Sequence, residues 1–128
     1  MIFVDTSVWV RFLRGGDSKL SERLSTALER DEVALAAPVR VEILAGAPVR
    51  HFHQLRRYLS ALPVFFPSRD TWELINRWLE RAAQRGQRFG MGDLLIGAMA
   101  AERGGAVWSL DLDFARMARL GFLKLYPE

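Results

Sequence analysis

Four aspartates lie where predicted strands end or predicted helices begin. Asp5 follows an apolar run at the N-terminus, Asp93 follows a glycine-rich turn, and Asp111 and Asp113 follow the apolar run 106–109. Taken singly, each has a structural explanation, because Asp is a preferred helix N-cap and is favoured in a helix's first turn. Taken together, carboxylates gathered at one edge of a sheet repel one another, so they need a cation or must stay partly protonated.

Glu42 is a fifth acidic position, and it is harder to explain by local structure. It sits among Val41, Ile43 and Leu44 on a short predicted helix. Glutamate is rarely buried without a partner. Two alternatives follow: Arg40 or another arginine pairs with it, or its carboxylate faces a polar cavity.

The donor types indicate which cation such a site would bind. The sequence contains no cysteine, which excludes thiolate zinc sites and disulfides. Carboxylate oxygens without His or Cys suit Mg²⁺ or Mn²⁺, and Mg²⁺ is commonly shared with a substrate phosphate. The acidic set therefore indicates phosphoryl transfer or phosphodiester hydrolysis.

The elements that must position these acids alternate along the chain. Short apolar strands are predicted at 1–5, 32–37, 63–66, 106–109 and 122–125. Helical periodicity predicts helices that begin near residues 6, 18, 38, 49, 70, 92 and 114. This alternation predicts an α/β domain with a short, mostly parallel central sheet, and ligands of such folds bind beyond the carboxyl ends of the strands. The predicted helix 70–85 is expected to pack one apolar face, made of Trp72, Ile75, Trp78, Leu79 and Ala82.

Length and charge set the remaining limits. The 128 residues fit one domain spanning 1–128, and the net charge is +3. Of the 18 basic residues, only Lys19 and Lys124 are lysines. Arginine suits phosphate recognition, but a GC-rich genome would give the same excess. No apolar run is long enough to cross a bilayer and no signal peptide is visible, so we expect a soluble cytoplasmic protein.

Five arginines are candidates for holding a nucleic acid around the acidic site. Arg85 and Arg88 come first, because they lie in the loop before Asp93, and the alternative for each is an ordinary solvated side chain. The other three candidates are Arg11, Arg14 and Arg40.

The sequence resembles a known family in four motifs. The order and spacing of four motifs are similar to those of PIN domains, above all the VapC-type toxins of toxin–antitoxin modules, and the resemblance covers essentially the whole chain. The motifs are Asp5-Thr6-Ser7, the stretch from Pro38 through Glu42-Ile43-Leu44-Ala45-Gly46, Gly92-Asp93-Leu94-Leu95-Ile96-Gly97-Ala98, and Ser109-Leu110-Asp111-Leu112-Asp113-Phe114. Two departures are mild: Ser109 stands where threonine is common, and Gly97, which we expect only to weaken its helix, stands where alanine is common.

The resemblance implies a three-layer α/β/α fold and an endoribonuclease that uses one or two Mg²⁺ or Mn²⁺ ions. It implies that Ser7 and Ser109 orient the carboxylates or waters. It also implies an RNA substrate, a cognate antitoxin that blocks the site, and a homodimer. The implied catalytic acids are Asp5, Glu42, Asp93 and Asp111, and the implied metal ligands are Asp5, Asp93, Asp111 and Asp113. Whether Asp111 or Asp113 is the principal last ligand stays open.

Two other functions fit parts of the pattern. A receiver domain of a response regulator shares the length and an acidic pocket, but it needs an aspartate near the middle of the chain, and none lies between Asp31 and Asp70. A PIN-like fold that binds RNA without cleaving it is the second alternative, and the full acidic set argues against it.

Overall fold

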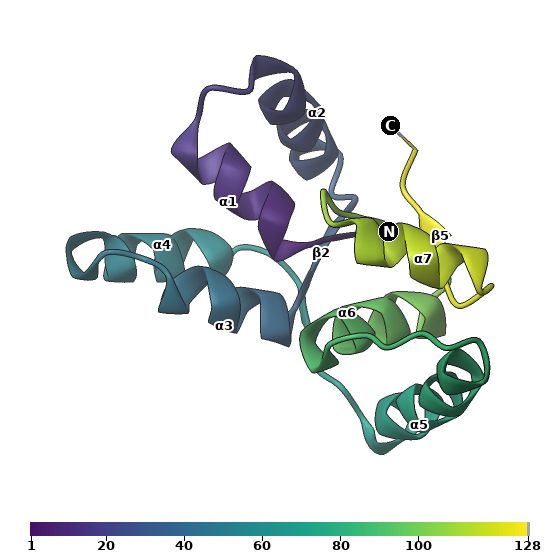
Figure 1. Cartoon of the computed structure of the whole chain (residues 1–128). Coiled ribbons are helices and arrows are strands. Elements are labelled where there is room, and N and C mark those ends of the chain that lie inside the picture. The colour runs from purple at the N-terminus through teal and green to yellow at the C-terminus, as the bar shows by residue number, and fades with distance from the viewer. Residues whose placement is uncertain (128) are drawn as a thin grey trace.

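The computed structural model describes residues 1–127. All the expected elements are present, with bounds that differ from the prediction by at most three residues, and the helix predicted from residue 49 begins as a 3₁₀ turn. In chain order they are β1 (Ile2–Val4), α1 (Thr6–Arg14), α2 (Ser18–Glu29), β2 (Val33–Ala36), α3 (Ala37–Ala45), the 3₁₀ turn η1 (Val49–His51), α4 (Phe52–Leu59), β3 (Val64–Phe65), α5 (Arg69–Gln84), α6 (Met91–Glu102), β4 (Ala106–Trp108), α7 (Leu112–Arg119) and β5 (Lys124–Leu125) (Figure 1).

The five strands form one sheet in the order β3-β2-β1-β4-β5, and every described pair is parallel. β1 and β2 are buried along their whole length, as the continuous apolar runs predict for a sheet covered on both faces. In the β1–β4 pair, Val4 lies opposite Trp108, and the backbone N–H of Asp5 donates to the Trp108 carbonyl at 2.8 Å. The carboxyl ends of β1 and β4 therefore meet at the same edge.

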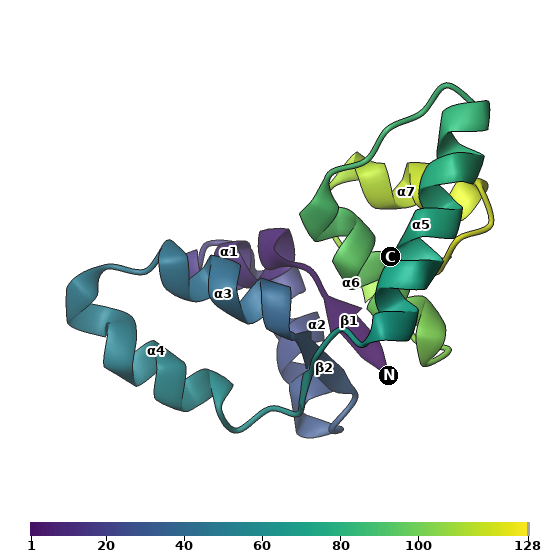
Figure 2. The same ribbon diagram turned by 90° about the horizontal axis from the view of Figure 1, so that it is seen from below.

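Helices cover both faces of the sheet, so the predicted three-layer α/β/α architecture is confirmed. Figure 2 shows α1, α2, α3 and α4 on one side of β1 and β2, and α5, α6 and α7 on the other. At the sheet's carboxyl edge the two helical layers come together, because α3 also contacts α6. None of the helices described within residues 1–127 combines the length and apolarity needed to span a membrane.

Side chains local in sequence fix where several helices begin. Asp5 caps α1, Asp17 caps α2, and Ser68 opens α5 with a capping box. Between α1 and α2 the chain turns through Gly15 and Gly16, whose φ angles of 76° and 91° are ones that glycine adopts without steric cost. This turn lets α2 fold back against α1.

The apolar face of α5 is narrower than predicted. Ile75, Trp78 and Ala82 are buried, whereas Trp72 and Leu79 are each 44% exposed. The reason is that α5 packs mainly on α6, so only the stripe directed at α6 is covered. Trp72 and Leu79 lie at the margin of that stripe.

Gly97 has a packing role that the sequence analysis did not foresee. A Cβ at this position of α6 would lie 2.8 Å from Cδ2 of Leu123 and 3.4 Å from the Trp78 ring. The Trp78 ring is in turn stacked on Phe122, with ring centres 4.7 Å apart. Glycine thus lets α6 approach these side chains closely.

Candidate active site

Asp5 ends β1 and caps α1 at the same time. Its Oδ2 accepts a hydrogen bond from the backbone N–H of Ser7 at 3.4 Å, and the residue is only 6% exposed. A buried carboxylate is costly unless hydrogen bonds compensate for its lost hydration. The groups that surround Asp5 therefore determine whether it can stay ionised.

Two serine hydroxyls supply that compensation. Ser7 Oγ and Ser109 Oγ donate to Oδ2 of Asp5 at 2.8 and 2.7 Å. Each hydroxyl then accepts a backbone N–H: Ser7 from Leu110 at 3.0 Å, and Ser109 from Asp111 at 2.9 Å. Because each serine has one proton and gives it to Asp5, the pair ties the loop after β4 to the end of β1. Their predicted role as orienting residues fits this geometry.

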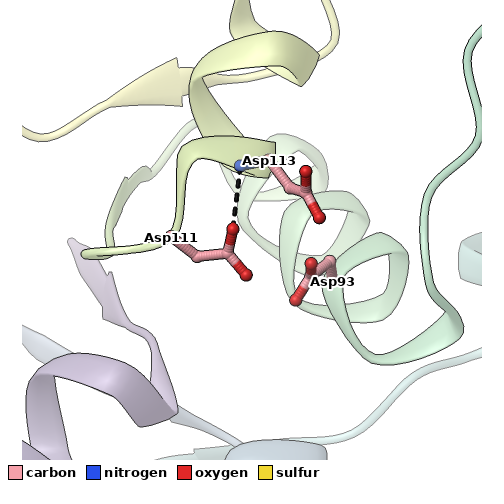
Figure 3. Close-up of side chains that lie close together, drawn as sticks. All are labelled: Asp93, Asp111 and Asp113. Atoms are coloured by element: carbon pink, nitrogen blue, oxygen red, sulfur yellow. Dashed lines mark hydrogen bonds between the residues drawn. The ribbon is translucent and has the colours of Figure 1, made fainter.

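Three aspartates from two helices form a compact cluster beside Asp5. Asp93, Asp111 and Asp113 each offer a carboxylate oxygen, and these oxygens lie within 4.8 Å of one another (Figure 3). Asp93 lies in the first turn of α6, and Asp113 lies in the first turn of α7. Capping of the last helix was one explanation open for Asp113, but α7 begins at Leu112, and Asp111 is its N-cap, accepting from the Asp113 N–H at 2.9 Å.

The crowding of these carboxylates has an electrostatic consequence. The pKa of Asp93 is raised from 3.8 to about 7. Burial is the largest cause, because it penalises the charged form, and the negative charge of Asp111 is the next. The further acids that raise the pKa are Asp5, Asp113 and Glu42, in decreasing order of effect. A cation bound here would reverse this effect, and the oxygen-only donor set fits a hard divalent ion.

Glu42 is exposed, contrary to the apolar surroundings expected for it. The reason is that α3 buries only Val39 and Ile43, while Val41 is 62% exposed. Glu42 Oε1 accepts a hydrogen bond from Thr6 Oγ1 at 2.9 Å. Glu42 is therefore tied to the start of α1, next to Asp5 in the chain, and it lies at the margin of the acidic cluster.

The arginine partner considered for Glu42 lies elsewhere. The Arg40 guanidinium sits over the ring of Phe66, 5.9 Å from its centre. Within the part of the chain that the structure describes, neither Arg40 nor another arginine forms a salt bridge with Glu42. The arginine alternative raised for Glu42 is thus replaced by a hydroxyl partner, whereas the cavity alternative is not contradicted, because Glu42 lines a hollow together with Arg14 and Gln54.

Arg116 is a site residue that the sequence analysis missed. Its Nη1 donates to Oδ1 of Asp113 at 2.8 Å, and its guanidinium lies 4.6 Å from the centre of the Phe89 ring. The available signal was the i,i+3 spacing of Asp113 and Arg116 on a helix, which brings such side chains together. Arg116 holds one oxygen of a cluster carboxylate.

Arg11 and Arg14 lie near the acidic site. Both line a hollow that begins at Ser7 and runs along the turn between α1 and α2. Arg11 is also 3.8 Å from Asp17. These two arginines flank the serine that anchors Asp5.

Arg85 lies in a different place from the one we expected. It lines a hollow with Arg119 at the C-terminal end of α7, whereas Asp113 lies in the first turn of that helix, roughly 10 Å along the axis. Proximity in the chain to Asp93 did not bring Arg85 to the acids, because Arg85 stands at the C-terminal end of α5, and that end lies beside Arg119 and Leu120. Arg88 is exposed in the loop 85–90.

Comparison with known proteins connects this geometry to a family. Residues 2–120 match the model of the PIN domain. Ribonuclease VapC11 of Mycobacterium tuberculosis is 30% identical over 125 residues, which cover 94% of this chain and 93% of that protein.

Solved structures agree with the family match. VapBC2 from Rickettsia felis, bound to a promoter DNA fragment, superposes with a TM-score of 0.80 over 98% of both chains, at 20% identity. VapBC-5 from Mycobacterium tuberculosis, a member of the VapBC family of toxin-antitoxin systems, gives a TM-score of 0.68 at 26% identity, over 98% of this chain and 97% of that one. The chain therefore belongs to the PIN domain family, with VapC ribonucleases among its relatives.

Proposed function

We propose that this protein is a divalent-metal-dependent endoribonuclease and the toxin of a toxin–antitoxin pair. The observation that carries the proposal is the meeting of Asp93, Asp111 and Asp113 within 4.8 Å, beside the serine-anchored Asp5. The match to the PIN domain and the ribonuclease relative support it. Membership of this family excludes the receiver-domain alternative.

The cluster residues are suited to hold one or two Mg²⁺ or Mn²⁺ ions. Every hydrogen bond that the Asp5 carboxylate accepts from residues 1–127 ends on Oδ2, which leaves Oδ1 available to a cation. Asp93, Asp111 and Asp113 would supply the other ligands. When bound, the metal supplies Lewis acidity toward the phosphodiester and makes water a better nucleophile.

The chain's own residues hold these ligands in place. Ser7 and Ser109 fix the carboxylate plane of Asp5, and Arg116 fixes Asp113 through Oδ1. We keep Glu42 in the proposed catalytic set. Its hydrogen bond with Thr6 places it at the side of the site where α1 begins. Pre-set ligands of this kind need little reorganisation as the reaction proceeds.

A cleavage assay tests this function. A pool of end-labelled single-stranded RNA should be cut when Mg²⁺ or Mn²⁺ is present and left intact with EDTA. We expect Asp93→Asn to lower kcat/KM by about 10²-fold or more. Asp70→Asn is the matched control, because Asp70 also lies in the first turn of a helix, on α5, outside the cluster.

Two results would contradict the proposal. Wild-type rates in Asp93→Asn would show that the site is wrongly assigned. Binding of RNA without metal-dependent cleavage would instead support the non-catalytic PIN module.

The partners are proposed on the same basis. We propose a cognate antitoxin, because one of the structures most like this chain belongs to a toxin–antitoxin system. We also propose a homodimer in the cytoplasm, with the exposed Trp72 and Leu79 as apolar surface available for contact. Light scattering of the purified chain, alone and with the product of the adjacent reading frame, measures both associations.

A further inference from the structure

A second hollow lies against the acidic cluster and shares Asp111 with it. This cleft has a volume of about 360 Å³, and it is bounded by α2, by the loop between β4 and α7, and by the end of the chain at Tyr126. Leu112, which stands between Asp111 and Asp113, lines the cleft and is 79% exposed. A ligand in this cleft would therefore lie directly beside the proposed reaction centre.

One wall of the cleft presents a fixed guanidinium that lies over two aromatic rings. The Arg23 guanidinium lies 4.7 Å from the ring centre of Trp108 and 5.3 Å from that of Tyr126. Arg23 also donates to the Pro127 carbonyl at 2.5 Å, so three contacts hold its plane in place. Aromatic rings and arginine planes are the surfaces on which proteins stack the unpaired bases of single-stranded RNA.

The cleft adjoins the hollow that contains Arg11 and Arg14. Asp17 and Lys19 line both spaces, so the two lie next to each other along the α1–α2 hairpin. Four cationic side chains face these two spaces against two carboxylates. The cations are Arg11, Arg14, Lys19 and Arg23, and the carboxylates are Asp17 and Asp111. This balance favours a polyanionic chain that passes along the hairpin.

We propose that the cleft between Arg23, Tyr126 and Leu112 binds the base of one unpaired nucleotide, whose neighbouring phosphodiester lies at the Asp93–Asp111–Asp113 cluster. The proposal rests on the proposed ribonuclease function and names the substrate form, a single strand. Bases in a duplex are stacked and cannot enter a side cleft without being extruded. Lys19 would contact a phosphate where the cleft adjoins the arginine-lined hollow.

Blocking the cleft tests this assignment. Leu112→Trp places a larger ring in the cleft from an exposed position, so the fold should be unaffected. Binding is measured by fluorescence anisotropy without divalent metal, using octauridylate and an eight-residue abasic ribose-phosphate of the same charge. We expect wild type to bind octauridylate at least 5-fold more tightly than the abasic chain, and Leu112→Trp to reduce that ratio toward one.

Two further variants complete the design. Lys19→Ala should weaken both probes equally, by about 3-fold or more, because it removes a phosphate contact and no base contact. Val49→Trp is the control for adding a surface ring, since Val49 is 91% exposed and outside the cleft, and it should leave both affinities unchanged.

The outcomes separate this proposal from the proposed function. An unchanged octauridylate-to-abasic ratio in Leu112→Trp would overturn base binding, and it is also the result expected if the cleft docks a protein segment instead. The wild-type chain could instead show the expected octauridylate-to-abasic ratio but fail to cleave RNA with Mg²⁺ or Mn²⁺. That result would overturn the ribonuclease function alone.

Discussion

At the scale of single residues, the fold raises the pKa of Asp93 when no metal is bound. In the unfolded chain its carboxyl ionises near pH 3.8, whereas in the fold its pKa is about 7. Between these values the unfolded state has released a proton that the folded state retains. Stability is therefore lost as the pH rises through this window, and the loss is complete above pH 7.

Asp93→Asn should consequently stabilise the metal-free protein at pH 8. The undiscounted shift corresponds to about 4 kcal/mol, but solvent screening of a partly exposed group reduces it to about 1–2 kcal/mol. The substitution also removes the favourable interaction of the carboxylate with the α6 dipole, which lowers the gain in stability by about 0.5 kcal/mol. We expect Tm to rise by about 3–5 °C at pH 8, as measured by calorimetry, and this gain to shrink toward pH 4.

Added Mg²⁺ provides the control for that prediction. It should raise the Tm of wild type, because a ligand of the folded state stabilises it, and raise that of Asp93→Asn less. A gain in Tm that does not depend on pH would show that removal of charge is not the cause.

Ser109 is the second residue with a testable role. Ser109→Ala removes one donor to the buried Asp5 carboxylate and the acceptor for the Asp111 N–H. We expect a loss of about 1–3 kcal/mol in stability and about 10–100-fold in metal affinity or cleavage rate, measured by denaturant unfolding and by Mn²⁺ titration.

The conservative variant distinguishes orientation from packing. Ser109→Thr keeps the hydroxyl and should retain most metal affinity. Ser60→Ala, which removes an exposed hydroxyl just after the end of α4, should change neither quantity. Equal metal affinity in Ser109→Ala and wild type would exclude the orienting role.

At the scale of elements, α6 combines two demands that constrain its sequence. Its first turn must present Asp93 at the carboxyl edge of the sheet, while most of the helix is buried between α5 and the strands. Gly97 satisfies the second demand, because its missing side chain leaves room for Leu123 and Trp78. Glycine lowers the intrinsic helix propensity at this position, but it allows the close packing.

Gly97→Ala tests which effect is larger. Alanine gains about 1 kcal/mol in helix propensity, but its Cβ must displace Leu123, and overpacking costs about 1–3 kcal/mol. We expect a net loss of about 1 kcal/mol in the free energy of unfolding, measured with urea. Gly92→Ala on the same helix has nothing within 4 Å of the added Cβ and should be neutral or slightly stabilising. A stabilised Gly97→Ala protein would show that Leu123 yields without cost.

At the scale of the whole molecule, acidic and basic groups are separated along the chain but adjacent in space. The carboxylates come from β1, α6 and α7, while the nearest basic side chains come from the α1–α2 hairpin. A second basic region, with Arg85 and Arg119, lies at the far end of α7. RNA that reaches the cluster should therefore be held mainly by the hairpin.

Salt dependence of RNA binding compares the two basic regions. Removing two phosphate contacts from a single strand lowers the slope of log K against log salt by about 1.4. We expect this change for the Arg11→Ala/Arg14→Ala double variant and little change for Arg85→Ala/Arg119→Ala, measured by anisotropy across a KCl series. RNA binding by Arg88 stays a prediction, to be tested with a single substitution at that residue. The reverse order of the two double variants would place the RNA path over the far end of α7.

The α/β architecture and the acidic residues could be predicted from the order of residues alone. Apolar runs of strand length, alternating with helical periodicity, reflect burial on both faces of a parallel sheet, which is a local property of composition. Asp5, Asp93 and the Asp111/Asp113 pair were recognisable because each follows a strand or opens a helix. Helix caps at Asp5 and Asp17 likewise depend on neighbouring residues alone.

The surroundings of those residues depend on how distant elements pack, and they could not be predicted in the same way. Glu42 is exposed and bonded to Thr6 because of how α3 lies against α1, and Arg85 lies away from the acids because of where α5 ends relative to α7. The small space beside Gly97 and the cleft at Arg23 each join segments far apart in sequence. Periodicity shows which face of a helix is buried, but not which partner covers it, because the packing of distant elements fixes the partner.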